Sequence, residues 1–402
     1  MFRVQTFNKI ADKGLAYLPA EGGSAPGRPG AAGYEVGPDV ENPDGILLRS
    51  QKLHDMDFGP ELKAIARAGA GVNNIPVDRC TREGIVVFNT PGANANSVKE
   101  LVISGLLLSS RRIHEGLSWV ESQGATEDLA KAVEKQKSGF AGPELAGKTL
   151  GVVGLGAIGV MVANAAVNLD MEVIGFDPYL SVESAWGLSR SVRRANSLEA
   201  LLAGSDYISL HVPLNDGTRS MINGESLTAV KKGARLLNFA RGGLVDTEAV
   251  LAALETDSLS RYVTDFPEAS LQNNEKVLAI PHLGASTPEA EENCAVMAAR
   301  QLRDFLETGN IVNSVNFPDC EVHATENARI VITNENVPNM VGQYTTILAE
   351  EGINILDLLN RHRDSIAYNI IDLDRPASKE TLDRIRGIEG VIRVREIVNG
   401  HK

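Results

Sequence analysis

Apolar and polar positions alternate along this chain in short runs that predict strands separated by helices. The N-terminal run F-R-V-Q-T-F is typical of a strand, and from Asp44 short apolar runs such as D-G-I-L-L-R-S and G-I-V-V-F-N-T-P-G alternate with helical segments. This order predicts parallel βαβ units. Residues 97–119 are predicted to form one long helix, with Ser97 as its N-cap and Glu100 three residues later.

A second series of alternating elements runs from Lys148 to about Pro281, and residues 287–306 are predicted to be helical. From about Cys320 the pattern changes to strand, helix, two alternating strands, helix and strand. That βαββαβ order predicts a small ferredoxin-like unit.

One stretch, residues 19–33, is rich in Gly, Ala and Pro and offers little apolar surface to bury. Two interpretations stay open for it: a mobile loop with a role in function, or a linker with none.

Length and charge narrow the class of protein. At ~100–200 residues per domain, 402 residues correspond to two to four domains. The net charge of −13 argues against a nucleic-acid partner. We expect no membrane segment, because no apolar run reaches about 18 residues, and the N-terminus lacks the form of a signal peptide. The three cysteines are widely spaced, which favours a reduced cytoplasm and predicts no metal site.

The strongest motif is K-T-L-G-V-V-G-L-G-A-I-G, which closes an apolar strand and opens a helix. Gly154 permits a tight turn, Gly156 lets the backbone approach a pyrophosphate, and Gly159 lets helix and strand pack closely. A second strand ends at Asp177, 18 residues after Gly159, where a carboxylate can bind both ribose hydroxyls. Since its charge would repel a 2′-phosphate, the motif predicts NAD and not NADP.

Three further strand ends carry residues suited to oxidising an alcohol. Arg241 follows an apolar strand in F-A-R-G-G, where it can hold a substrate carboxylate. His282, in P-H-L-G-A-S-T, is the candidate base that removes the hydroxyl proton. Glu268, in the loop after Y-V-T-D-F-P, is expected to raise the pKa of His282 and to fix its tautomer.

The order of G-L-G-A-I-G, F-A-R-G-G and P-H-L-G-A-S-T resembles the D-isomer-specific 2-hydroxyacid dehydrogenase family, over about residues 44–317. The resemblance implies a Rossmann-like NAD-binding domain, residues 92–282, inserted in a flavodoxin-like α/β substrate domain, residues 1–91 and 283–318. It also implies that the active site lies in the cleft between them. The remainder, residues 320–402, resembles an ACT domain.

The same resemblance implies further site residues. Those expected around the cofactor are Ala157, Ile158, Val212, Phe239, Ala240 and Asp265, with Asp265 at the nicotinamide carboxamide. Those expected around the substrate are Arg49, Ser50, Ala70, Gly71, Val72, Asn94 and Lys137. Arg49 and Ser50 match a pair that meets the carboxylate and phosphate, and Lys137 matches a lysine that reaches across from a neighbouring subunit.

The chain departs from the family at the catalytic acid. The family has Phe or Tyr, two residues and then Glu, but from Phe266 that spacing reaches Ala269. Either the loop is one residue shorter here, so that Glu268 is the acid, or the acid comes from elsewhere, with Glu275 the next along the chain. Glu268 is the assignment we test.

In the ACT-like segment, T-N-E-N-V-P-N-M stands where serine-regulated relatives have a His-Glu-Asn-Arg-Pro-Gly turn. Asn334 replaces the His, Asn336 keeps the Asn, Asn339 replaces the Gly, and Asn354 matches another effector-contacting residue. Part of the polar set is thus present. An effector site and a purely structural dimerisation module both stay open, and the resemblance implies a homodimer or homotetramer.

The activity that the resemblance implies is NAD-dependent oxidation of 3-phosphoglycerate, the first step of serine biosynthesis. Glycerate, lactate or erythronate phosphate are alternative substrates for the same chemistry. A non-catalytic NAD-sensing scaffold is a further alternative, and the intact Arg241 and His282 motifs argue against it.

Overall fold

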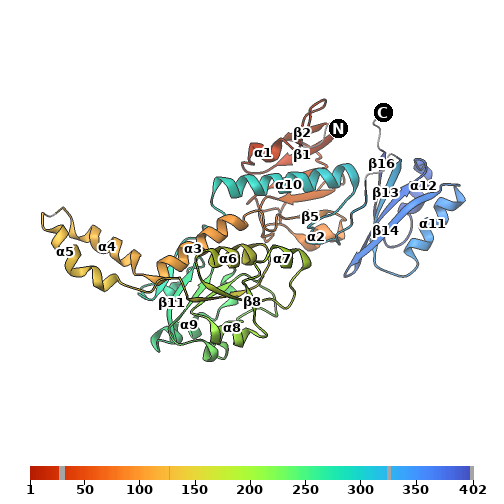
Figure 1. Cartoon of the computed structure of the whole chain (residues 1–402). Coiled ribbons are helices and arrows are strands. Elements are labelled where there is room, and N and C mark those ends of the chain that lie inside the picture. Colours follow the sequence, from red (N-terminus) through yellow and green to blue (C-terminus); the bar gives the residue numbers. More distant parts are fainter. Residues whose placement is uncertain (27–31, 126, 324–326, 399–402) are drawn as a thin grey trace. The chain divides into compact units, whose positions relative to one another are not determined.

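The computed structural model describes residues 1–26, 32–125, 127–323 and 327–398. Its contacts divide the chain into two compact units (Figure 1). Unit 1 contains Met1–Ala93 and Glu291–Lys402, and unit 2 contains Asn94–Ala290. Residues 27–31, in the middle of the Gly/Ala/Pro-rich stretch, lie outside the described residues, so both interpretations of that stretch stay open.

Unit 2 is built on a seven-stranded parallel sheet of order β12-β11-β10-β9-β6-β7-β8. Its strands are β6 (Thr149–Val153), β7 (Glu172–Phe176), β8 (Arg193–Arg194), β9 (Tyr207–Leu210), β10 (Ala234–Asn238), β11 (Leu259–Thr264) and β12 (Val277–Ala279). They are joined by the helices α6 (Ala157–Asn168), α7 (Val182–Gly187), α8 (Leu198–Gly204) and α9 (Thr247–Glu255) and the 3-10 turns η2 (Ser226–Ala229), η3 (Gly242–Leu244) and η4 (Ala269–Leu271). The first six strands follow the order 3-2-1-4-5-6 of dinucleotide-binding sheets, which confirms the predicted Rossmann-like fold.

Two helices replace the single helix predicted over residues 97–119. They are α3 (Ala95–Ser110) and α4 (Ile113–Gln123), with an extended residue between them. The hydroxyl of Ser110 is buried and lies 2.6 Å from that of Tyr207 in β9. The first helix therefore ends where its last turn packs against the sheet, and this reason is not visible in the local sequence.

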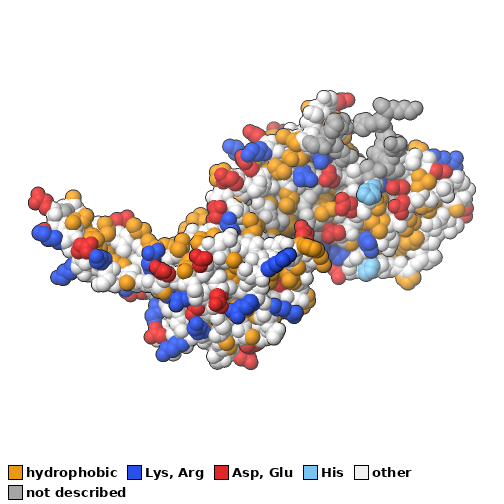
Figure 2. All heavy atoms as spheres, viewed as in Figure 1, with side chains coloured by type: hydrophobic (Ala, Val, Ile, Leu, Met, Phe, Trp, Pro, Cys, Tyr) orange, Lys and Arg blue, Asp and Glu red, His pale blue; other side chains and the backbone are white. Residues whose placement is uncertain are grey.

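An arm formed by α4, α5 (Leu129–Gln136) and η1 (Lys137–Phe140) extends from the sheet of unit 2 (Figure 1). No described residue of α4 or α5 is buried. Hydrophobic side chains lie on the surface of this arm (Figure 2). Its exposed apolar residues include Ile113, Leu117 and Val120. The arm thus exposes apolar surface in the single chain.

Unit 1 contains a five-stranded parallel sheet of order β2-β1-β3-β4-β5. The strands are β1 (Phe2–Thr6), β2 (Tyr34–Gly37), β3 (Gly45–Leu48), β4 (Ala64–Arg67) and β5 (Val86–Phe88), and the helices are α1 (Asp12–Leu15), α2 (Val77–Arg82) and α10 (Pro288–Thr308). The order 2-1-3-4-5 is that of the flavodoxin-like fold, as predicted. Because α10 packs Ala295, Ala298 and Leu302 into this core, the chain returns to the first domain after the NAD-binding segment.

The C-terminal part of unit 1 is a four-stranded antiparallel sheet of order β14-β15-β13-β16 with two helices. In chain order its elements are β13 (Ala328–Glu335), α11 (Met340–Glu350), β14 (Ile355–Arg363), β15 (Ile366–Leu373), α12 (Lys379–Arg386) and β16 (Val391–Val398). This βαββαβ order confirms the predicted ferredoxin-like unit.

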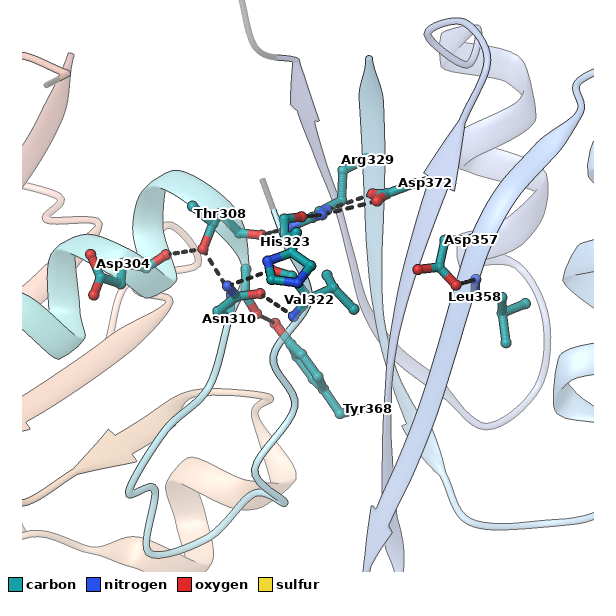
Figure 3. Close-up of polar contacts among 11 residues, drawn as sticks. Asp304, Thr308, Asn310, Val322, His323, Arg329, Asp357, Leu358, Tyr368 and Asp372 are labelled. Atoms are coloured by element: carbon teal, nitrogen blue, oxygen red, sulfur yellow. Dashed lines mark hydrogen bonds and ion pairs between the residues drawn. The ribbon is translucent and has the colours of Figure 1, made fainter. Parts of the chain in front are cut away.

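A buried ion pair lies within this antiparallel sheet, and its arginine also contacts the end of α10 (Figure 3). The guanidinium of Arg329 donates to both carboxylate oxygens of Asp372, at 2.6 and 3.0 Å. It also donates to the backbone oxygens of Thr308 and His323, at 2.9 and 2.7 Å. Arg329 is 2% exposed, so these contacts replace the water that its charge loses.

Among the residues that the structure describes, no helix is both long and apolar enough to cross a bilayer. Cys80, Cys294 and Cys320 are buried and free.

Candidate active site

The turn between β6 and α6 has the geometry of a phosphate-binding loop. Gly154 adopts φ +91°, and a Cβ there would lie 2.7 Å from the carbonyl oxygen of His211. A Cβ on Gly159 would lie 2.0 Å from the oxygen of Gly154, so helix and loop approach too closely for any side chain. At Gly156, the N-cap of α6, a Cβ would meet nothing within 4 Å. The helix N-terminus therefore faces open space that an anionic phosphate can enter.

Asp177 lies directly after β7 and is tied to this loop. Its Oδ2 accepts the backbone N–H of Leu155 at 2.8 Å, and its Oδ1 accepts that of Tyr179 at 2.8 Å. Each oxygen keeps a second lone pair. The carboxylate is thus held beside the phosphate loop with acceptor capacity left for ribose hydroxyls.

The other predicted cofactor positions lie at the same edge of the sheet. Ala157 and Ile158 form the first turn of α6, and Val212 follows β9. Phe239 and Ala240 follow β10, with Phe239 5% exposed. The donor set and the open cradle at Gly156 fit a dinucleotide.

Three ionisable residues follow neighbouring strands of this sheet. The pairing register sets Asn238 of β10 level with Thr264 of β11, and Thr264 level with Ala279 of β12. Arg241, Asp265 and His282 come one to three residues after these positions. Because carboxyl ends of parallel strands meet at one edge, residues distant in sequence become neighbours.

His282 and Asp265 form a contact pair. Nδ1 of the imidazole lies 3.0 Å from Oδ2 of Asp265, which is 1% exposed. The ring of Phe266 lies against the imidazole, with 4.9 Å between ring centroids. The contact with Asp265 raises the pKa of His282, whereas its partial burial and the charge of Arg241 lower it.

The structure differs from the sequence prediction at Glu268. This carboxylate is exposed, and its Oε2 accepts the hydroxyl of Thr247, the first residue of α9, at 2.9 Å. The acid in contact with His282 is Asp265, and this contact raises the pKa of the imidazole. The physical reason is the backbone register between the two strands. The N–H of Ile280 donates to the oxygen of Thr264 at 2.9 Å, and this bond brings the segment that leads to His282 beside Asp265.

Arg241 is exposed and follows β10. The backbone turn that carries it is held by Asn238, a residue that the sequence analysis did not identify. The side chain of Asn238 donates to the backbone oxygen of Arg241 at 2.9 Å and accepts the N–H of Ala240 at 3.2 Å. Asn238 is fully buried. This role could have been predicted from the sequence, because Asn238 is a polar residue at the last position of a mostly apolar strand.

A family model described as D-isomer specific 2-hydroxyacid dehydrogenase, NAD binding domain, matches residues 103–286. The D-3-phosphoglycerate dehydrogenase of Escherichia coli K12 is 32% identical over 365 residues, 87% of this chain and 85% of that protein. The chain belongs to the D-isomer specific 2-hydroxyacid dehydrogenase family.

Two further members show the range of similarity. The D-3-phosphoglycerate dehydrogenase of Synechocystis is 36% identical over 315 residues, 75% of this chain, and the chain spans only 54% of that relative's length. The crystal structure of a 3-phosphoglycerate dehydrogenase from Entamoeba histolytica, with NAD+ bound, is 26% identical with a TM-score of 0.57. It covers 78% of this chain and 98% of its own. The matched segment of our dehydrogenase is the family's NAD-binding domain, and its cofactor is NAD.

The predicted substrate residues of this family member divide between the units. In unit 1, the backbone N–H groups of Arg49, Ser50 and Gln51 converge on the side-chain oxygen of Asn8, at 3.4, 2.9 and 2.9 Å. The guanidinium of Arg49 pairs with Glu291 at 2.7 Å and is 39% exposed. Asn8 thus shapes the predicted anion-binding turn, another role that the sequence did not indicate.

The loop after β4 holds Ala70, Gly71 and Val72, all partly exposed. Asn89 donates to the oxygen of Ala70 at 2.6 Å and so fixes this loop within unit 1.

In unit 2, Asn94 is the N-cap residue of α3, and its side chain makes no capping hydrogen bond to the helix. Lys137 is exposed on the arm and pairs with Glu134 at 2.5 Å. Their roles toward substrate stay predictions.

The predicted effector residues do not converge within one chain. Asn334 is 1% exposed, and its side chain accepts from Asn369 at 2.7 Å inside the sheet. Asn336 contacts the backbone of Asp364, just after β14, whereas Asn354 directly precedes β14. Nine residues of strand at ~3.3 Å each separate these ends by roughly 30 Å. The local turn is kept, however, since Asn339 adopts the left-handed conformation at φ 69°.

Proposed function

We propose that this dehydrogenase oxidises 3-phosphoglycerate to 3-phosphohydroxypyruvate with NAD, as the first step of L-serine biosynthesis. The observation that carries the proposal is the placement of His282, Arg241 and the NAD loop at one edge of one parallel sheet. The names of the relatives support the choice of substrate.

NAD, when bound, would supply the acceptor for the hydride from C2 of the substrate. The residues of this chain supply the rest. With Nδ1 turned to Asp265, the other ring nitrogen of His282, Nε2, is free to take the hydroxyl proton as C2–O becomes a carbonyl. Arg241 is exposed beside the imidazole and holds the carboxylate at C1. The imidazolium then releases its proton to solvent.

A phosphorylated substrate needs further cations, and Arg49, Ser50 and Lys137 are the candidates. Arg49 already binds an anion, the carboxylate of Glu291. A phosphate carries more charge than a carboxylate at neutral pH, so it competes well for this guanidinium.

We further propose a homodimer or homotetramer in the cytoplasm. The exposed apolar residues of the arm, Ile113, Leu117 and Val120, favour burial against a second copy. The unpaired cysteines fit a reducing compartment.

The test is the formation of NADH with 3-phosphoglycerate, measured in parallel with D-glycerate, D-lactate and erythronate 4-phosphate. We expect the highest kcat/KM with 3-phosphoglycerate. A higher kcat/KM with one of the others would replace the substrate and keep the chemistry. NAD binding in calorimetry without turnover of any of the four would support the NAD-sensing scaffold instead.

A further inference from the structure

Three positions compete for the role of the acid paired with the catalytic His282. The family's spacing from Phe266 points to Ala269, the predicted acid Glu268 contacts Thr247, and the buried carboxylate beside the imidazole is that of Asp265. We infer that Asp265 is the positioning residue that orients His282 for proton transfer, and that Glu268 holds the N-terminus of α9 instead. This inference rests on the proposed function.

The first support is geometric. Asp265 is the residue directly after β11, and His282 is the third residue after β12, the neighbouring strand. The 3.0 Å separation of Nδ1 and Oδ2 allows one tautomer to dominate in the neutral ring, with the proton on Nδ1. The lone pair is then on Nε2, which is the state that a general base needs.

The second support is burial. Asp265 is 1% exposed, and neither of its carboxylate oxygens makes a hydrogen bond of full geometry to a described residue, although Oδ2 lies 3.0 Å from Nδ1 of His282. A buried carboxylate with so few partners is costly, and a positive imidazolium beside it offsets part of that cost. Glu268 is exposed, so water and salt screen its charge, and its carboxylate contacts Thr247.

The third support is the packing of the imidazole on its other side. Phe266 follows Asp265 directly and lies 4.9 Å from the ring of His282, centroid to centroid. The N–H of Phe266 donates to the hydroxyl of Thr264 at 3.1 Å, which fixes the turn that carries both residues. The three residues from Thr264 to Phe266 therefore hold the ring by one charged contact and one aromatic contact.

The proton balance is simple. The substrate hydroxyl proton passes to Nε2 and the Nδ1 proton stays on the ring, so the step needs no proton transfer to Asp265. The charged groups that face the imidazole are Asp265 after β11 and Arg241 after β10, with opposite effects on its pKa. Without the carboxylate of Asp265, partial burial and the charge of Arg241 remain, and both lower the pKa of His282, so we expect this pKa to fall.

The decisive experiment compares Asp265→Asn with Glu268→Gln in the full chain. The pKa of His282 is measured by NMR of histidine-labelled protein without NAD, with the signal assigned through His282→Asn. We expect Asp265→Asn to lower this pKa and Glu268→Gln to leave it unchanged. A lower pKa in Glu268→Gln with none in Asp265→Asn would overturn the inference, whether or not the protein oxidises 3-phosphoglycerate.

Kinetics give the second readout. In the oxidation direction the base must be neutral, so Asp265→Asn should move the acidic limb of kcat/KM to lower pH and reduce kcat by roughly 10- to 100-fold, less than loss of His282. Asp265→Glu should restore part of both. Circular dichroism checks that each variant is folded. A change confined to KM for NAD, with an unmoved pH profile, would assign Asp265 to cofactor binding alone and reject the positioning role.

Discussion

The parallel sheet of unit 2 and the antiparallel sheet at the C-terminus both carry polar residues near their strand ends, with opposite results. In the parallel sheet, Arg241, Asp265 and His282 meet at one edge because every strand ends there. In the antiparallel sheet, Asn336 and Asn354 lie at opposite ends of β14, and Asn334 is buried. The direction of the strands decides whether residues distant in sequence can form one site.

The two sheets also use charge differently. The parallel sheet leaves His282 59% exposed, so its charge is available for chemistry. The antiparallel sheet buries Arg329 and Asp372 against each other and against backbone oxygens (Figure 3), so their charges serve the fold. We therefore expect substitutions in the first sheet to change rates and substitutions in the second to change stability.

The largest expected effect is the loss of His282. His282→Asn removes the base and should lower kcat by ~100- to 10,000-fold. NAD affinity, measured by fluorescence titration, should stay within a few-fold because the phosphate loop lies at other strands. A variant that keeps more than a fifth of the wild-type kcat would remove His282 from the catalytic machinery.

The matching change in the antiparallel sheet is Asp372→Asn. It leaves the buried guanidinium of Arg329 without its counter-ion, and breaking such a pair costs about 3–5 kcal/mol in the free energy of unfolding. The control is Asp383→Asn, which breaks the exposed pair with Arg386 and should cost less than about 1 kcal/mol. Equal denaturation midpoints in urea for the two variants would contradict the contrast between buried and exposed pairs.

The fold was largely predictable because strand and helix periodicity reflects which faces are buried. The G-L-G-A-I-G turn and its Asp177 followed from glycine sterics and from the charge of a phosphate, both local properties. The break between α3 and α4 was not predictable, because Ser110 ends its helix against Tyr207, nearly 100 residues away. The contact between Asp265 and His282 was not predictable for a similar reason, since it depends on the register between β11 and β12.

A smaller effect is expected at Asp177, where the predicted discrimination against NADP is tested. Asp177→Asn keeps an acceptor for the N–H of Leu155 but removes the charge that repels a 2′-phosphate. Loss of one charged hydrogen bond costs roughly 1.5–3 kcal/mol, so kcat/KM with NAD should fall about 10- to 100-fold. Wild-type protein that uses NADP as well as NAD would contradict the assignment.

The turn of Arg49 tests whether unit 1 contributes a phosphate site. Arg49→Ala should raise KM for 3-phosphoglycerate by roughly tenfold, since a charged hydrogen bond at a partly exposed site is worth the low end of 1.5–3 kcal/mol. Glu291→Gln should lower KM slightly because it frees Arg49. The matched control is Glu292→Gln, whose carboxylate pairs with Lys13 instead. Identical KM values for Glu291→Gln and wild type would show that this pair does not compete with substrate.

The smallest expected effect is on regulation by serine, and it tests the other half of the comparison. An amino-acid effector needs donors and acceptors that converge on its charged ends, but Asn334 already binds Asn369, and Asn336 and Asn354 lie at opposite ends of β14. We therefore expect weak inhibition or none when the initial rate is measured against serine concentration.

The experiment uses the full chain, because Arg329 and Tyr368 of the antiparallel sheet bond to the backbone at the end of α10 and just beyond it, and truncation would expose that face. Asn336→Ala and Asn354→Ala should then leave the rate unchanged at every serine concentration. Inhibition by micromolar serine that either substitution abolishes would contradict this prediction. It would mean that the antiparallel sheet brings these residues together by pairing β14 with β14 of a second copy. In such an antiparallel pair, the opposite ends of the two strands are neighbours.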